Sequence, residues 1–308
     1  MTCAEQEPPG PAALHVVYRS YGGENRKGRP DWYSKVLALT SLVRAVEAVD
    51  GDVEVLFVND GPVPEERLSL MHRAGHEVLR IDKGSNRGSL RWALRLAERR
   101  GWPPDDLVLL LEDDYLLVPT ALQEVVQAAR RWTAVDYFAV YGQPSTARPT
   151  TYGQQGPDSS ASGQSWVPFD STTSSFAVRV GALLVDHARL SLLPFTGGAW
   201  DHATCMVVQG RPPFSLRDTF LPDPAPAGTP AHRRAARVAA LAAVRLLGQA
   251  SAVRRPTRRR LLYGPAVPVA THMETGLISD GRDWPALAAE TEAWWRDRQA
   301  GPEARAGA

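Results

Sequence analysis

The sequence predicts an α/β protein built on a doubly wound, mostly parallel sheet. Short apolar segments of strand length alternate with longer segments whose apolar residues recur at helical spacing, from residue 14 to residue 132. Turn-forming residues separate these segments. Strands that alternate with helices form βαβ units with right-handed crossovers, so the carboxyl ends of the strands should meet along one edge of the sheet.

The first half of the chain carries the regular pattern. Four buried strands are expected, over residues 14–18, 53–58, 77–81 and 107–111. Helices are expected between and after them, over residues 32–49, from residue 64, over residues 89–100 and from residue 119 to residue 132. Asp31 is placed to cap the first helix, and Gly101 is placed to end the third.

The second half is less regular. Strands are expected over residues 137–141 and 175–180, and helices over residues 186–193, 203–208 and 231–247. Residues 143–164 are rich in Gly, Ser, Thr and Pro and predict a long loop, a kind of segment that often binds ligands. Residues 222–230 have the Pro/Ala composition of a linker. Residues 1–11 and 302–308 are expected to be disordered tails.

Composition narrows the class of protein. The net charge of +1 provides no overall field that would favour nucleic acid. Cys3 and Cys205 are the only cysteines, which predicts no disulfide framework and a reducing compartment. We find no signal-peptide pattern and no apolar stretch of about 18 residues that could cross a membrane, so a cytoplasmic location is expected. Arginine greatly outnumbers lysine, which is typical of GC-rich bacterial genomes.

The segment from Arg233 to Arg260 concentrates basic residues on and after an expected helix. Two interpretations apply to it. A solvated helix face is one, and peripheral contact with anionic lipid or a phosphorylated acceptor is the other.

Three consecutive acidic residues, Glu112, Asp113 and Asp114, follow the fourth expected strand. Side chains alternate along a strand, so Glu112 and Asp114 should point to one face and Asp113 to the other. Two carboxylates on one buried face repel each other, and a divalent cation with a preference for oxygen ligands relieves that repulsion. The triplet therefore predicts a magnesium or manganese site, with a solvated acidic turn as the alternative.

Four motifs in this order resemble the nucleotide-sugar-binding half of GT-A-fold glycosyltransferases of the family 2 type. They are the polar end of the first strand, Asn59-Asp60-Gly61 after the second, the segment from Asn86 to Ala93, and the acidic triplet. The resemblance covers roughly residues 14–205 and returns at His272. It implies a GT-A fold with a nucleotide-sugar-binding half over residues 12–142. Residues 143–301, with the basic helix, would form the acceptor side of the same domain.

The resemblance also implies roles for the nucleotide site. Asp60 would accept a hydrogen bond from a base with an N–H edge, such as uracil, although Asn59-Asp60-Gly61-Pro62 also makes a good turn. Asn86 would lie beside the nucleotide. Three arginines, Arg19, Arg87 and Arg91, would lie near the phosphates, with solvated arginines as the alternative.

The acidic triplet matches the Asp-x-Asp position of the family. By resemblance Asp114 binds Mn²⁺ or Mg²⁺ directly, and Glu112 binds the ribose or a metal-bound water. Asp113 joins the nucleotide-sugar site with a less defined role. His272 would be a further metal ligand, since neutral imidazole suits manganese; a hydrogen-bonded core histidine is the alternative.

A final motif, from Thr196 to Thr204, has a Gly-rich turn followed by Asp201 and His202. In inverting members of the family an acidic residue in a comparable place is the general base for the acceptor hydroxyl. Asp201 is expected to fill that role, although Trp200 stands where the family more often has a second acid. The alternatives are His202 as the base and an N-cap role for Asp201.

The motifs and the resemblance together predict a metal-dependent glycosyltransferase, for which the resemblance favours inversion, with retention as the alternative. It would move a sugar from a nucleoside-diphosphate donor, in the first place a UDP-sugar, to a hydroxyl or amine on a small-molecule or glycan acceptor. A sugar-phosphate nucleotidyltransferase is the first alternative, but the segment Tyr21-Gly22-Gly23 lacks the basic phosphate-loop signature of that class. A non-catalytic nucleotide-sugar-binding module of the same fold is the second alternative.

Overall fold

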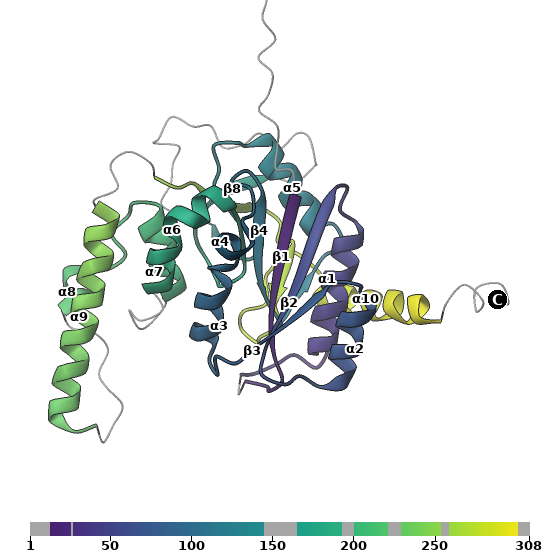
Figure 1. Ribbon diagram of the computed structural model, residues 1–308, viewed down its shortest axis with the longest axis horizontal. Helices are drawn as coiled ribbons and strands as arrows, with labels where there is room; N and C mark the ends of the chain where they lie inside the picture. Colours follow the sequence, from purple (N-terminus) through teal and green to yellow (C-terminus); the bar gives the residue numbers. More distant parts are fainter. Residues whose placement is uncertain are drawn as a thin grey trace, which may run out of the picture.

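The computed structural model describes residues 13–25, 27–144, 165–192, 200–220, 229–253 and 259–300. A nine-stranded sheet runs through the described residues in the order β3-β2-β1-β4-β9-β6-β10-β8-β7 (Figure 1). The expected tails lie outside these residues, as do most of the loop over residues 143–164 and of the linker over residues 222–230.

Four parallel strands form one half of the sheet. They are β1 (Ala13–Tyr21), β2 (Asp52–Asp60), β3 (Glu77–Ile81) and β4 (Leu107–Glu112). β1 pairs with β2 on one side and β4 on the other, and β2 pairs with β3. Each of these strands was expected. β3 has the predicted range, whereas β1, β2 and β4 each extend at least one residue beyond the apolar segment that predicted them.

The other half of the sheet mixes strand directions. It contains β9 (Phe176–Arg179), β6 (Tyr137–Ala139), β10 (Leu262–Pro265), β8 (Trp166–Thr172) and β7 (Gly142–Pro144). β9 runs antiparallel to β4 and β6, and β8 runs antiparallel to β10 and β7. Seven of the nine strands therefore run in the same direction, as the expected, mostly parallel sheet requires.

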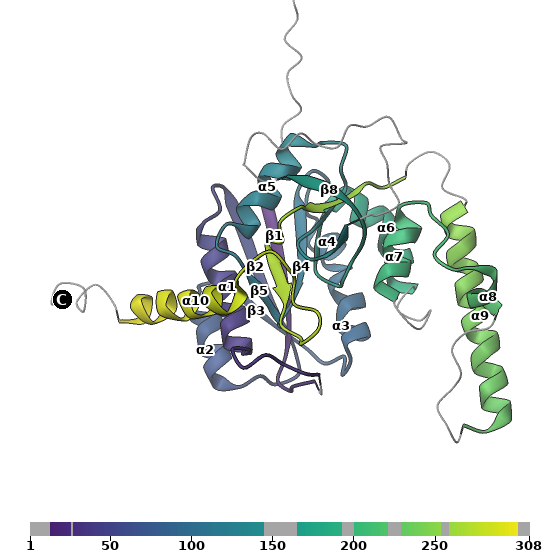
Figure 2. The ribbon, with the colours of Figure 1, turned by 180° about the vertical axis from the view of Figure 1, so that it is seen from behind.

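Helices cover both faces of the sheet (Figures 1 and 2). One apolar cluster joins the sheet to α1 (Lys35–Glu47), α2 (Glu65–Arg73), α5 (Ala121–Arg131) and α10 (Trp284–Gln299). A second cluster joins it to α3 (Asn86–Ala93), α4 (Leu96–Arg100), α6 (Val180–Leu192) and α7 (Trp200–Val208). Neighbouring strand residues alternate between the clusters: Val16 lies in the first and Val17 in the second. The doubly wound α/β fold class is confirmed.

Four helix starts differ from the sequence prediction by three or more residues. α6 begins at Val180 rather than at residue 186, α7 begins at Trp200 rather than at residue 203, and α1 and α3 differ as well. α1 begins at Lys35 because Ser34, not Asp31, accepts a hydrogen bond from the backbone N–H of Leu37 at 2.9 Å. The helix expected over residues 89–100 is two helices, α3 and α4. Ser85 caps α3, which begins at Asn86, three residues before the predicted start. Gly101 ends the second as expected, with the left-handed φ of 64° that glycine adopts readily.

A small two-stranded sheet joins segments that are far apart in the sequence. β5 (Tyr115–Leu117) follows the acidic triplet directly and pairs antiparallel with β11 (Ala270–His272). In this ladder His272 lies opposite Tyr115. Neither strand was predicted, because three residues carry too little periodicity to be recognised.

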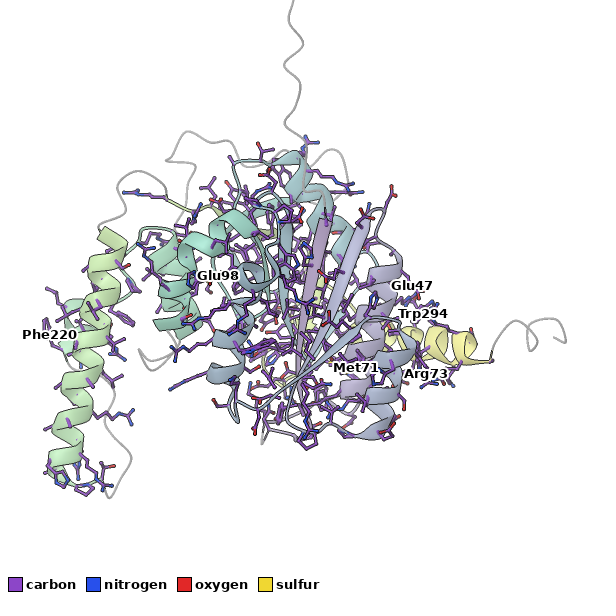
Figure 3. All side chains as sticks on the ribbon, in the orientation of Figure 1. Glu47, Met71, Arg73, Glu98, Phe220 and Trp294 are labelled. Carbon is purple, nitrogen blue, oxygen red and sulfur yellow. The ribbon has the colours of Figure 1, made fainter. Side chains whose placement is uncertain are left out.

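One end of the molecule carries α8 (Leu216–Phe220) and the long helix α9 (Ala231–Val253). Figure 3 shows Phe220 at this end and Trp294 of α10 at the other. Residues 231–240 of α9 are all exposed, whereas Arg245 and Arg260 are buried. Arg260 pairs with Asp136 and Asp186, so the basic segment is not one continuous solvated face. Within the described parts of the chain, no helix has the length and apolar character needed to span a membrane.

Candidate functional site

The carboxyl ends of the central strands bring the predicted residues to one edge of the sheet. In the β1–β4 ladder Arg19 lies opposite Glu112, and in the β1–β2 ladder Tyr21 lies opposite Asp60. The loops that leave β1 and β2 pack closely. A Cβ atom on Gly22 would be 2.1 Å from the carbonyl oxygen of Pro62, so only glycine fits there.

Arg19 is a buried cation at the centre of this edge, only 4% exposed. Its Nη2 donates to Glu112 Oε1 at 3.1 Å and also contacts Asn86 Oδ1. Its Nε and Nη1 atoms are buried and have no hydrogen-bond partner in the described structure. Burial raises the pKa of Glu112, although the charge of Arg19 opposes that rise. Arg19, Asn86 and Glu112, which were predicted separately, thus form one cluster.

Asp114 and His272, the two predicted metal ligands, are in direct contact. Asp114 Oδ2 lies 3.0 Å from His272 Nε2 and 3.0 Å from Arg29 Nη2, while its Oδ1 is buried and without a partner in the described structure. Burial on its own would raise the pKa of Asp114, but the hydrogen bonds and charges of His272 and Arg29 prevail and lower it to about 2. Asp114 is therefore ionised throughout the neutral range.

The β5–β11 ladder explains how a late histidine reaches the triplet. Its register sets His272 beside Tyr115, with the two ring centroids 4.9 Å apart. The ladder continues in a hydrogen bond of 2.9 Å from the backbone N–H of Met273 to the carbonyl oxygen of Asp114. The contact between Asp114 and His272 is thus built into the backbone pairing.

Asp113 has a different set of partners from Glu112 and Asp114, although it lies in the turn after β4 and not in the strand whose alternation predicted this. Its Oδ2 lies 2.9 Å from Lys35 Nζ and 3.4 Å from Arg67 Nη1, and it accepts from the backbone N–H of Tyr21 at 3.2 Å. Burial raises the pKa of Asp113, against the opposing charge of Lys35. These internal contacts anchor the end of β1. The expected contact of Asp113 with a nucleotide sugar stays a prediction.

Sequence reasoning missed the cations that hold the triplet, namely Arg29, Lys35 and Arg67. Lys35 had one available signal, because it is one of only three lysines in the chain and begins a helix directly after a polar loop. Arg29 and Arg67 have no local signal, since arginine is abundant and both reach the triplet only through the tertiary fold.

The remaining predicted nucleotide-binding residues lie at the same edge. Asp60 Oδ1 accepts from the backbone N–H groups of Lys83 and Gly84, at 2.6 and 3.2 Å, and so orders the loop that leads into α3. Arg87 and Arg91 are exposed on α3, the helix that begins with Asn86. The contacts of these residues with a nucleotide stay predictions.

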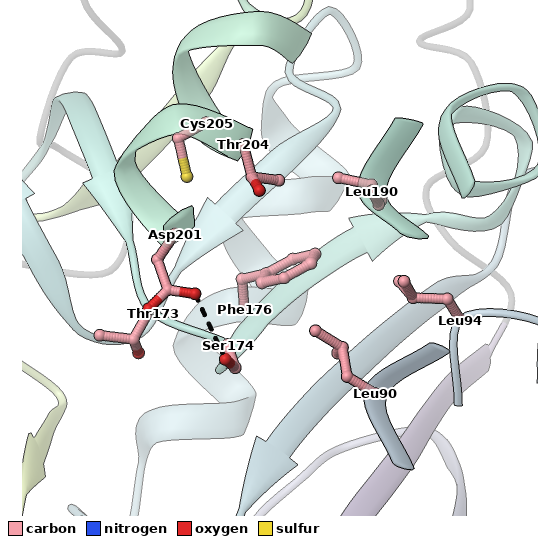
Figure 4. A pocket seen from close by; sticks show the side chains of 9 residues that line it. All are labelled: Leu90, Leu94, Thr173, Ser174, Phe176, Leu190, Asp201, Thr204 and Cys205. Atoms are coloured by element: carbon pink, nitrogen blue, oxygen red, sulfur yellow. Dashed lines mark hydrogen bonds between the residues drawn. The ribbon is translucent and has the colours of Figure 1, made fainter. Parts of the chain in front are cut away.

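Asp201 lies in the first turn of α7, beside a small cavity lined mainly by apolar side chains (Figure 4). Ser174 Oγ donates to Asp201 Oδ1 at 3.4 Å. Burial, and after it the charge of Glu112, raises the pKa of Asp201 to about 7. Because α7 begins at Trp200, Asp201 is inside the helix rather than its N-cap. The Gly-rich turn that precedes α7 lies outside the described residues.

The cavity adjoins the triplet through a side-chain contact. Thr173, one of the lining residues, hydrogen-bonds through Oγ1 to the hydroxyl of Tyr115, the residue after Asp114. The other lining residues are Leu90, Leu94, Ser174, Phe176, Leu190, Thr204 and Cys205. The influence of Glu112 on the pKa of Asp201 agrees with this proximity.

The residues around Asp114 fit a divalent cation when the ligand supplies part of the coordination. Asp114 Oδ2 and His272 Nε2 lie 3.0 Å apart, at hydrogen-bond distance, so a carboxylate and an imidazole are available side by side. Asp114 Oδ1 is a buried carboxylate oxygen without a partner in the described structure. The described residues contain no group of three or more His, Cys, Asp or Glu side chains suited to a metal, so further ligands would come from phosphate oxygens or water.

No family model and no curated protein matches the chain. Solved structures show similarity at low identity. Residues 1–349 of S. aureus TarS are 14% identical, with 63% of this chain and 54% of that chain covered and a TM-score of 0.39. CMP:2-keto-3-deoxy-manno-octonic acid synthetase in complex with CTP is 14% identical, with 62% and 81% covered and a TM-score of 0.38.

A third similar structure is 4-diphosphocytidyl-2C-methyl-D-erythritol synthase from Anaerococcus prevotii. It is 13% identical, with 64% of this chain and 82% of that chain covered and a TM-score of 0.39. The chain spans about half of the TarS fragment and 32% of a longer TarS structure. At these identities and scores the similarities do not extend to a reaction or a substrate. The fold class therefore rests on the observed strand order and helix packing.

Proposed function

We propose that the protein is a divalent-metal-dependent glycosyltransferase that uses a nucleoside-diphosphate sugar. One observation carries the proposal: within the described residues, two buried guanidinium nitrogens of Arg19 and one buried carboxylate oxygen of Asp114 lack partners at the same edge of the sheet. Leaving buried polar atoms unpaired costs about 1–3 kcal/mol each. A diphosphate together with its divalent cation supplies acceptors for Arg19 and a positive charge for Asp114.

Five residues at this edge would have a part in donor binding. Asp114 and His272 would hold Mn²⁺ or Mg²⁺, and the bound ion would neutralise charge on the diphosphate as the sugar departs. Arg19 would pair with a phosphate, and it fixes Glu112 in place for a ribose hydroxyl or a metal-bound water. Asp60 uses Oδ1 to order the α3 loop, which leaves Oδ2 to accept from an N–H edge such as that of uracil.

Asp201 would be the general base that takes the proton of the acceptor hydroxyl or amine in an inverting transfer. Its pKa of about 7 supports this role, because a base is most effective when its pKa lies near the working pH. Its neighbourhood supports it as well. The cavity beside it connects to the triplet through Thr173 and Tyr115.

A nucleotidyltransferase is the main alternative. That chemistry calls for basic groups in the loop after the first strand, directed at a nucleoside triphosphate. Here Arg29 and Lys35, which follow β1, are directed at Asp114 and Asp113 instead. This arrangement favours the glycosyltransferase.

Calorimetric titration with UDP, GDP, CDP, dTDP and CTP, each with and without Mn²⁺, tests the proposal. We expect UDP to bind tightly only in the presence of metal. An Arg19→Met variant should lose this binding, while Arg100→Met, which breaks only a surface pair with Glu77, should keep it. Preference for CTP over every diphosphate would favour the nucleotidyltransferase. Absence of binding by any nucleotide under both conditions would reject both enzymes.

A further inference from the structure

Arg29 occupies a central position in the site that the proposed reaction does not explain. It lies in the loop after β1, with its side chain 13% exposed. Nη2 donates to Asp114 Oδ2 at 3.0 Å and to Asn25 Oδ1 at 2.8 Å, and Nη1 donates to the carbonyl oxygen of Met273 at 2.6 Å. The guanidinium also lies 4.3 Å from the ring centroid of Tyr33. One side chain thus connects the loop, the triplet and the segment that carries His272.

The surrounding contacts hold this loop against the same segment. The backbone N–H of Thr275 donates to the carbonyl oxygen of Gly28 at 3.0 Å, and Lys27 Nζ lies 2.5 Å from Glu274 Oε2. Of these loop contacts, only those of Arg29 reach Asp114. The loop would therefore remain attached at Gly28 and Lys27 if Arg29 moved.

Arg29 and a divalent cation make conflicting demands on Asp114. Oδ2 already receives Arg29 on one side and His272 on the other, both at 3.0 Å. A cation bound to this carboxylate would bring two like charges within a few ångströms of each other in a partly buried site, where charge repulsion is strong. Charge repulsion therefore opposes the binding of a cation to Asp114 for as long as Arg29 stays hydrogen-bonded to the carboxylate.

We propose that Arg29 is a positioning residue that competes with the metal ion. In the metal-free protein it holds the Asp114 carboxylate in its binding orientation, and metal binding displaces it from that oxygen. The inference rests on the metal site of the proposed function. It adds that Arg29 weakens metal binding, so that the ion enters most readily when a diphosphate is present to take up the displaced positive charge. Metal and nucleotide should then bind cooperatively.

Titration of the metal-free protein with Mn²⁺ in the absence of nucleotide tests this competition, with free Mn²⁺ measured by electron paramagnetic resonance. We expect Arg29→Ala to bind Mn²⁺ roughly tenfold more tightly than the wild type, because a charge-assisted hydrogen bond no longer opposes the ion. Lys27→Ala is the matched control. It removes one positive charge from the same loop without touching Asp114, and should change the affinity by about twofold at most.

A second variant covers the case in which Arg29→Ala does not fold. Arg29→Lys keeps the charge but has a single donor nitrogen, and its Mn²⁺ affinity should lie between those of the wild type and the alanine variant. In a parallel titration with UDP, the increase in UDP affinity caused by Mn²⁺ should be largest in the wild-type protein.

Three outcomes would overturn the inference. They are an unchanged or weaker Mn²⁺ affinity in the Arg29 variants, an equal gain in Lys27→Ala, and no Mn²⁺ binding in any of the proteins. UDP titration of the wild-type protein with and without Mn²⁺ separates this failure from that of the proposed function, since it reports on metal-dependent nucleotide binding. UDP binding that still requires Mn²⁺, together with an unchanged Mn²⁺ affinity in the Arg29 variants, would leave the proposed function standing without the competition by Arg29.

Discussion

Asp114 and Asp201 are both aspartates near Glu112, but their surroundings shift their pKa values in opposite directions. Asp114 lies between His272 and Arg29, and its pKa falls to about 2. Asp201 lies beside an apolar cavity and near the charge of Glu112, and its pKa rises to about 7. Pairs of acids whose environments separate their pKa values in this way indicate a division of roles. Asp114 suits a permanently charged ligand, and Asp201 suits a proton acceptor.

The largest expected effect comes from Asp114. Replacing it with asparagine removes the anionic ligand but keeps the shape of the side chain. We expect turnover with a nucleotide-sugar donor to fall by roughly three orders of magnitude or more, because the loss affects charge stabilisation at the leaving group. Measurement of product formation checks this, with a circular dichroism spectrum to establish that the fold is intact. Near wild-type turnover would reject Asp114 as a metal ligand.

Asp201→Asn should reduce turnover by about 10²–10⁴-fold, the usual contribution of a general base. Donor affinity should change little, since Asp201 is not expected to contact the diphosphate. Steady-state kinetics at saturating donor provide the test, and Asp218→Asn, at the exposed helix α8, is a suitable control. A loss that appears only in donor affinity would move Asp201 from the acceptor side to the donor side.

The pH dependence of turnover sharpens the comparison. A base must be ionised to accept a proton, so the rate should rise as the pH increases through about 7 and level off above it. Asp114 adds no step in this range, because its pKa is about 2. A profile recorded from pH 5 to pH 9 that is flat in the wild-type protein would show that Asp201 is not the titrating base.

The smallest effects concern stability, and they should have opposite pH dependences. Ionised Asp114 stabilises the metal-free fold above its unfolded pKa near 4, and this contribution is lost as the pH falls through about 2. Asp201 stays protonated in the folded protein to about pH 7, so its contribution to stability declines as the pH rises from about 4 to about 7.

Thermal unfolding of Asp114→Asn and Asp201→Asn between pH 4 and pH 8 checks the direction of both changes in stability. At pH 8, in the presence of a chelator, Asp114→Asn should unfold at a lower temperature than the wild type and Asp201→Asn at an equal or higher one. The advantage of Asp201→Asn should shrink as the pH is lowered to 4. If both variants unfolded at a lower temperature than the wild type at pH 8, or both at a higher one, the environments described for Asp114 and Asp201 would be contradicted.

The site around Asp114 and the site around Asp201 also differ in how much of each could be predicted from the sequence. The triplet was recognisable because three carboxylates at the end of an apolar strand need positive charge nearby. The regular βαβ pattern also predicted which strand ends would meet. The compensating partners were not recognisable. His272 reaches Asp114 through the pairing of two three-residue strands, 158 positions apart in sequence, and Arg29 reaches it from a loop without regular structure.

For Asp201, which we propose acts on the acceptor, the position along the chain was evident from the sequence but the environment was not. The cavity draws its walls from α3, α6, α7 and the segment around Phe176, and no local pattern predicts that these side chains meet. The burial that raises the pKa of Asp201 is a property of this tertiary packing, as is the charge of Glu112. The residue type pointed to a base, whereas a pKa near 7 appears only in the folded chain.

The most direct test is UDP titration of Asp114→Asn and Asp201→Asn side by side in the presence of Mn²⁺. The division of roles predicts that Asp114→Asn loses the metal-dependent part of UDP binding, while Asp201→Asn binds UDP and Mn²⁺ like the wild-type protein. Retention of metal-dependent binding in Asp114→Asn, or its loss in Asp201→Asn, would contradict the assignment of the two aspartates.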